Sequence, residues 1–217
     1  MFDSDQTFVG ILKKFNRKER NLLIRDVLGR PEEKLHLGQD FLDRVNCVLG
    51  VSLSANAWWA TDYHFDWLFA AAKLFLQRAS LNFAQANGSE PMTWTQEDAD
   101  LVIADDKHLV LIEAKAYGAY DNEQFERKRL RFDQLCQEME GSGIELRFLL
   151  MSPRKPQKLR YPSGVEPFKW LELKLDPKTV VCRVERCDAS GKRAEKQGYW
   201  QILELPVAKA SDGSEGP

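Results

Sequence analysis

Two acidic residues and a lysine stand in a pattern that could hydrolyse a phosphodiester. Asp100 lies in one short run of Val, Ile and Leu, and after twelve intervening residues the triplet Glu113-Ala114-Lys115 ends the next such run. Carboxylate oxygens are the ligands that Mg²⁺ and Mn²⁺ prefer, and Mg²⁺ typically takes one or two of them beside water and substrate phosphate. A lysine ammonium beside the metal can hold its bound water or stabilise charge on phosphate. We therefore expect Asp100 and Glu113 to bind the metal and Lys115 to assist hydrolysis.

The two apolar runs, 99–105 and 108–115, predict the strands of a β-hairpin. A turn at Asp106-Lys107 sets a constant antiparallel register, in which Asp100 lies opposite Glu113. Carboxylates that face each other with Cβ atoms about 4.5–5.5 Å apart repel, so a cation should lie between them. Both faces of the hairpin are otherwise mainly apolar, which predicts a central place in a sheet covered on both sides.

The triplet alone is weak evidence, because the pattern [DE]xK begins at six positions: Glu32, Asp105, Glu113, Glu126, Glu172 and Asp176. Only the triplet at Glu113 follows a strand that carries an opposing acid. Glu172-Leu173-Lys174 also lies on a predicted strand, but leucines alternate with its charges, which favours a solvated face. The alternative for the triplet at Glu113 is a surface ion pair between Asp98 and Lys115, which leaves Asp100 opposite Glu113 unexplained.

Asp100 and Glu113-Ala114-Lys115 on a hairpin, with a helix before and a helix and strand after, resemble the PD-(D/E)xK nuclease superfamily. The resemblance covers about 61–152, and the stretches ATDYHFDWLFAA and LLMSPRKP resemble an uncharacterised bacterial branch of it. It implies a restriction-endonuclease-like α-β-β-β-α-β core, with a mixed central sheet flanked by helices. It also implies an enzyme that uses Mg²⁺ or Mn²⁺ to cut nucleic acid, DNA rather than RNA. Roles in restriction, other bacterial defence or DNA repair would follow, and Ala99 replaces the proline of the family's name.

The remaining pattern predicts an α/β protein. Apolar spacing predicts helices at 17–28, 39–49, about 61 to 77 or 80, and 121–140, and further strands at 145–152, 170–175, 179–185 and 199–205. We expect a helical appendage over 1–56, a nuclease-like core over 57–152, a β-rich extension of the same domain over 153–207, and a disordered tail over 208–217.

Two aspartates on the expected third helix could extend the metal site. Asp62 and Asp66 are four residues apart, so they would lie one above the other on that helix. In the family, the helix before the hairpin often lends an acidic residue to the site, which makes either aspartate an additional ligand by resemblance. The alternative is that negative charge near a helix N-terminus favours the helix dipole.

Five side chains are candidates for binding phosphate: Gln124 and Lys128 on the helix after the triplet, and Arg154, Lys155 and Lys158 in the loop 152–160. Related nucleases often place a glutamine or a base at the first two positions. For the helix the alternative is a solvated face opposite the Phe125 and Phe132 stripe. For the loop it is an ordinary exposed basic turn.

Composition first argues against a nucleic-acid partner, because 31 Lys plus Arg against 33 Asp plus Glu leave a net charge of −2. The charges are segregated, however: 97–106 holds five acids and no base, and 147–160 holds five bases and no acid. The four cysteines form no CxxC pair, which disfavours a zinc site or a disulfide framework.

The sequence also predicts the location and the possible partners of the protein. We expect no membrane span and no secretory signal, and hence a cytoplasmic protein. Many nucleases of this type cut duplexes as dimers, so a homodimer is a further expectation from the resemblance. The rival function is a catalytically inactive module of the same fold that binds nucleic acid or protein.

Overall fold

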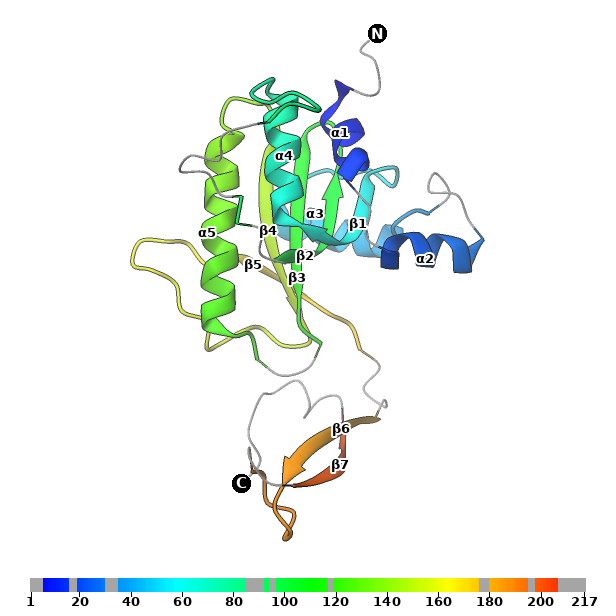
Figure 1. Cartoon of the computed structure of the whole chain (residues 1–217), viewed down its shortest axis with the longest axis vertical. Helices are drawn as coiled ribbons and strands as arrows, with labels where there is room; N and C mark the ends of the chain where they lie inside the picture. The colour runs from blue at the N-terminus through cyan, green and yellow to red at the C-terminus, as the bar shows by residue number, and fades with distance from the viewer. Residues whose placement is uncertain are drawn as a thin grey trace. The chain divides into compact units, whose positions relative to one another are not determined.

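Figure 1 presents a computed structural model of the chain, which describes residues 6–15, 19–29, 35–84, 92–93, 97–116, 119–175, 180–194 and 198–206. The tail expected at 208–217 lies outside the described residues. The helices are α1 (Phe8–Phe15), α2 (Glu19–Leu28), α3 (Gln39–Leu49), α4 (Phe65–Phe75) and α5 (Asn122–Glu138). The strands are β1 (Trp58–His64), β2 (Asp98–Ala104), β3 (His108–Ala114), β4 (Glu145–Ser152), β5 (Lys169–Glu172), β6 (Val180–Cys187) and β7 (Tyr199–Pro206).

By its internal contacts the chain divides into two compact units. The first contains residues 1–114, 121–151 and 160–171, and the second contains 115–120, 152–159 and 172–217. A five-stranded sheet in the order β1-β2-β3-β4-β5 organises the first unit, and β6 and β7 pair as a separate two-stranded sheet in the second. The β-rich extension expected at 153–207 therefore contributes to both units.

The five-stranded sheet is mixed: β2 runs antiparallel to β1 and β3, whereas β4 runs parallel to β3. Figure 1 shows α4 and α5 in front of this sheet and α3 behind it. The expected α/β class, with a mixed central sheet flanked by helices, is confirmed. A parallel step from β3 to β4 needs a long crossover, and α5 supplies it.

The predicted hairpin is confirmed in both its strands and its register. Val102 pairs with Leu111 and Leu101 with Ile112, as the two-residue turn requires. Val102, Leu111 and Ile112 are almost fully buried, because β2 and β3 have a strand on each outer side and helices on both faces. The apolar runs of the sequence are thus explained by burial on both faces.

The expected helix from Thr61 is wrong at its beginning. Residues 58–64 form β1, which pairs antiparallel with β2, and the helix begins only at Phe65. Aromatic and β-branched residues suit the half-buried strand, and the His64 side chain caps α4 by accepting a hydrogen bond from the Asp66 backbone N–H. From α3 to β4 the element order is therefore α-β-α-β-β-α-β, which is the expected α-β-β-β-α-β with the additional helix α4 between β1 and β2.

The N-terminal helices are more numerous than the sequence pattern predicted. Helices α2 and α3 agree with the expectation, and α1 is an additional helix that packs on α4. Phe8 meets Phe75 with ring centroids 5.4 Å apart, and the buried Tyr63 hydroxyl donates to the Leu12 carbonyl at 2.8 Å. The N-terminal segment is thereby tied to both α4 and β1.

Helix α5 is the element that faces the candidate site. Asp121 caps its N-terminus by accepting a hydrogen bond from the Gln124 backbone N–H at 2.8 Å. The predicted apolar stripe is confirmed, with Phe125, Phe132 and Leu135 buried. This stripe holds α5 on the sheet and so brings the basic residues beside it to the strand ends.

Candidate active site

The two expected metal ligands lie where the β2–β3 backbone ladder ends. Its last pair is Leu101 with Ile112, so the same register places Asp100 and Glu113 at the next position. Both residues are half-buried. Because directly opposed side chains of an antiparallel pair lie on one face, the two carboxylates belong to the same side of the sheet.

Asp100 is held by a backbone group of the neighbouring strand. Its Oδ2 accepts a hydrogen bond from the Ala114 N–H at 2.7 Å. The Asp100 carboxylate thus bonds to the β3 backbone at a position where β2 and β3 no longer pair through their own backbones. A hydrogen bond to the charged form of a carboxylate stabilises that form, and here it also orients the side chain.

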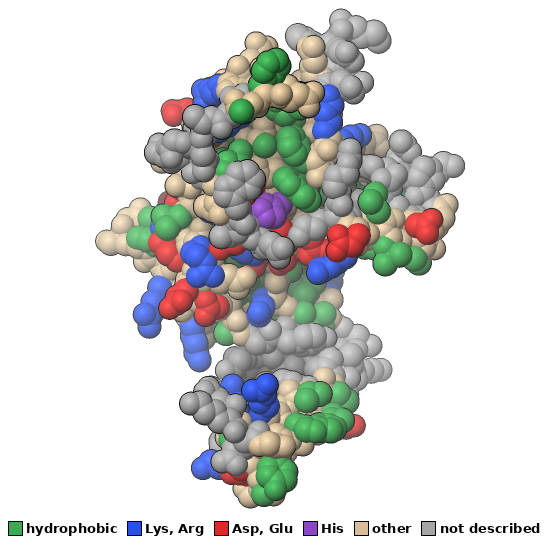
Figure 2. Space-filling view, in the orientation of Figure 1, with side chains coloured by type: hydrophobic (Ala, Val, Ile, Leu, Met, Phe, Trp, Pro, Cys, Tyr) green, Lys and Arg blue, Asp and Glu red, His purple; other side chains and the backbone are tan. Residues whose placement is uncertain are grey.

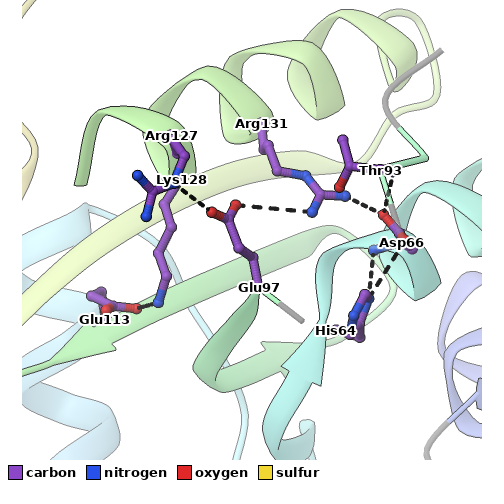
Figure 3. A network of polar contacts seen from close by, with 8 residues as sticks. All are labelled: His64, Asp66, Thr93, Glu97, Glu113, Arg127, Lys128 and Arg131. Carbon is purple, nitrogen blue, oxygen red and sulfur yellow. Dashed lines mark hydrogen bonds and ion pairs between the residues drawn. The ribbon is translucent and has the colours of Figure 1, made fainter. Parts of the chain in front are cut away.

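Glu113 is held by a lysine of α5. The Lys128 Nζ lies 2.5 Å from the Glu113 Oε2, and the two side chains are only 6% and 13% exposed. Figure 3 shows Lys128 reaching from the helix down to Glu113 on β3. The ammonium supplies a positive charge beside one of the two carboxylates, Glu113.

A second buried ion pair lies one helical turn further along α5. Arg131 donates through Nη2 to the Asp66 Oδ1, and the Thr93 backbone N–H donates to the same oxygen at 3.3 Å. The Arg131 guanidinium also lies over two rings of α4, 5.2 Å from the centroid of Phe65 and 5.6 Å from that of Phe69. This pair joins α4 to α5 at a site with little solvent.

Glu97 lies between the two pairs. Its Oε1 accepts from the Arg127 Nε at 2.9 Å, and its Oε2 is 4.0 Å from the Arg131 Nη1. Figure 3 shows the resulting arrangement, in which Lys128 and Arg131 point from α5 toward acids of the sheet and of α4. The polar network aligns α5 over the strand ends.

Asp62 and Asp66 do not share a helix, which corrects the expected additional ligands. Asp62 lies on β1 with a left-handed φ of 50° and pairs with Arg20 at 3.3 Å, and Asp66 is occupied by Arg131. An aspartate tolerates left-handed backbone better than most residues. Among the described residues, no three His, Cys, Asp or Glu side chains are grouped as a metal site would group them.

The expected phosphate-binding residues fall into different environments. Gln124 is exposed on the first turn of α5, whereas Lys128 is 5% exposed and faces Glu113 instead of lying on a solvated helix face. Lys115 follows β3 directly, is half-buried and belongs to the second unit. The loop residues Arg154, Lys155 and Lys158 also belong to the second unit, and all three are exposed.

The sequence pattern did not predict that Lys128, Arg129 and Arg131 of α5 are buried. Besides Lys128 and Arg131, the Arg129 side chain is 7% exposed and pairs with Glu126 and Asp133 of the same helix. The hydrogen bond from Arg129 lowers the pKa of Glu126, and burial raises the pKa of Asp133. The available signal was the occurrence of three bases within four positions of an otherwise amphipathic helix, which is compatible with an exposed face as well.

Comparison with family models, with curated proteins and with solved structures finds no match to this chain. No described helix is long and apolar enough to cross a membrane.

Proposed function

We propose that this protein is a Mg²⁺-dependent nuclease of the PD-(D/E)xK type that hydrolyses phosphodiester bonds of nucleic acid. The observation that carries the proposal is the position of Asp100 and Glu113, two half-buried carboxylates one step beyond the last pair of the β2–β3 ladder. One is oriented by the Ala114 N–H and the other by the Lys128 ammonium. The preference for DNA rests on the resemblance alone.

The two carboxylates fit the requirements of a hard divalent cation. Mg²⁺ is usually held in proteins by one or two carboxylates, with water and substrate oxygens completing its shell. Asp100 and Glu113 supply these two groups, and Mn²⁺ takes the same ligands. A bound Mg²⁺ would supply a Lewis acid for the phosphate and a water of lowered pKa.

The protein's own residues would orient the reaction. Lys128 holds Glu113 in place and offsets its charge, so that the two acids can be half-buried together. Lys115, two residues after Glu113 in the triplet, would hold the attacking water or stabilise charge on the phosphate. The exposed loop bases Arg154, Lys155 and Lys158 would contact the phosphate backbone.

The test is cleavage of supercoiled plasmid, single-stranded DNA and RNA with Mg²⁺, Mn²⁺ or EDTA. Asp100→Asn keeps an oxygen that can accept from the Ala114 N–H, and Glu113→Gln keeps the side-chain shape, so both variants should fold. We expect either change to lower the cleavage rate at least about a hundredfold, since each removes a ligand charge.

Glu172→Gln is the matched control, because Glu172 begins another [DE]xK triplet and is exposed. This variant should cut at the unmodified rate. Cleavage that persists in Asp100→Asn and Glu113→Gln, or that is absent with every metal and substrate, would refute the proposal.

The second candidate is a non-catalytic binding module of the same architecture. One observation favours it: the Lys128 ammonium already neutralises Glu113, so that one lysine does what a metal would otherwise do. The two candidates differ in metal affinity. A nuclease should gain thermal stability with millimolar Mn²⁺ and lose that gain in Asp100→Asn, whereas a module should not respond to the metal.

A further inference from the structure

The hairpin of β6 and β7 exposes one apolar face. In its antiparallel register Val184 lies opposite Ile202, and Arg186 lies opposite Trp200 in the neighbouring row. Val184, Ile202 and Trp200 are 69%, 58% and 66% exposed, and Arg186 is exposed as well. We call these four residues the hairpin surface. Figure 2 shows hydrophobic side chains at the surface of the unit that carries these strands.

The opposite face of the same hairpin is more covered. There Cys187 is 3% exposed and Gln201 and Leu203 are intermediate, whereas Tyr199, at the first position of β7, is exposed. Side chains alternate between the two faces of a strand. The hairpin surface is therefore exposed because its residues share the open face of the paired strands. An aromatic, two aliphatic side chains and an arginine gathered on one exposed face are typical of a binding surface.

The charge of the second unit points to an anionic partner. Residues 115–120, 152–159 and 172–217 contain 12 Lys plus Arg and 8 Asp plus Glu, a net charge of +4. The first unit contains the remaining 19 bases and 25 acids, a net charge of −6. A polyanion is therefore attracted to the unit that carries the hairpin surface.

The size of the surface argues against a second copy of the chain. Two strands of eight residues offer one face on the order of 300 Å², given about 3.4 Å per residue and about 4.8 Å between strands. A standard stable interface buries about 800 Å² on each partner. By contrast, a nucleobase needs only one aromatic ring to stack on, and a phosphate needs only one basic side chain.

We propose that the hairpin surface binds single-stranded nucleic acid, with a base stacked on Trp200 and the adjoining phosphate held by Arg186. The partner class rests on the proposed function as well as on the charge of the second unit. Ile202 and Val184 would contact the next base, and Glu204, two rows from Trp200, would mark the end of the surface by repelling phosphate. Stacking is tolerant of sequence, because every base has a π-face.

The experiment is fluorescence anisotropy of labelled 15-nucleotide DNA and RNA single strands, and of a duplex, with the full chain in EDTA. Trp200→Ala should weaken single-strand binding about ten- to a hundredfold, and Trp200→Phe should restore most of it. Arg186→Gln should weaken binding and lower the slope of log affinity against log salt by about 0.7. Tyr199→Ala is the matched control, because this exposed aromatic precedes Trp200 and belongs to the opposite face.

Equal binding by the unmodified protein and Trp200→Ala would overturn the inference, as would failure of the unmodified protein to bind any single strand. A dimer in sedimentation that Trp200→Ala dissociates would overturn it in favour of a second copy. Binding in EDTA by a protein that cuts nothing with any metal would refute the nuclease proposal alone. If Glu113→Gln abolishes cleavage, while Trp200→Ala cuts and binds single strands as well as the unmodified protein does, this inference alone is refuted.

Discussion

Helix α5 makes two buried ion pairs, and they differ in chemistry. Arg131 meets Asp66 with its guanidinium over two phenylalanine rings of α4, and a backbone N–H shares the same carboxylate. Lys128 meets Glu113 through one ammonium, at a strand end beside the half-buried Asp100. A planar, stacked guanidinium is suited to fixing helices together, whereas a lysine is a point charge on a flexible stem.

This difference suits the Arg131–Asp66 pair to a structural role and the Lys128–Glu113 pair to a site where a metal ion could replace the ammonium. Asp66 lies on α4 where it meets α5, and its carboxylate is approached by Arg131, by the Thr93 backbone N–H and by the His64 ring. Glu113 lies beside a second carboxylate, so a divalent cation could stabilise both acids where Lys128 stabilises one. Two of the following measurements test this contrast, and a third tests how firmly α5 is packed.

The largest effect is expected from Arg131→Met. This change leaves Asp66 buried without its guanidinium, which should lower the free energy of unfolding by about 3–5 kcal/mol. Urea unfolding followed by circular dichroism measures the loss. The double variant Asp66→Asn with Arg131→Met should recover part of it, because no charge is then left alone. A loss below about 1 kcal/mol would show that the pair does not hold α4 to α5.

A smaller effect that depends on metal is expected from Lys128→Met. Without metal, Glu113 loses its counter-ion beside the half-buried Asp100, which should cost about 1–3 kcal/mol. Millimolar Mn²⁺ should restore more melting temperature to Lys128→Met than to the unmodified protein, because the cation now has no ammonium to compete with. Thermal unfolding with Mn²⁺ and with EDTA makes the comparison. No response to metal would make the Lys128 pair as structural as the Arg131 pair.

The smallest effect concerns the thiol of Cys136, on α5 one turn beyond Phe132. Burial, with help from the charge of Asp133, raises the pKa of this thiol to about 11. The reactive thiolate is then scarce at pH 8, so Cys136 should react with iodoacetamide far more slowly than the exposed Cys47. A folded-state pKa above the unfolded value also means that stability falls as pH rises from about 9 toward 11. Peptide mass mapping after timed labelling measures the rates, and labelling of Cys136 as fast as Cys47 would show that this flank of α5 opens.

Much of the fold could be predicted from local pattern. The β2–β3 hairpin follows from apolar runs and a two-residue turn, and helix α5 from its Phe125 and Phe132 stripe and the Gly141-Ser142-Gly143 stop. The strand β1 was missed because its aromatic residues lead directly into the apolar α4. Only pairing with β2 and the cap at His64 separate the two elements.

The row that Asp100 and Glu113 share follows from local sequence, because an antiparallel register is set by the turn and by which residues must be buried. Which charges meet them depends on how α5 packs on the sheet. From the sequence, Lys128 and Arg131 could equally have faced solvent, because the helical spacing shows which residues share a face of α5 but not what packs against that face. The packing of α5 on the sheet turned that face inward, and burial then required that each base meet an acid.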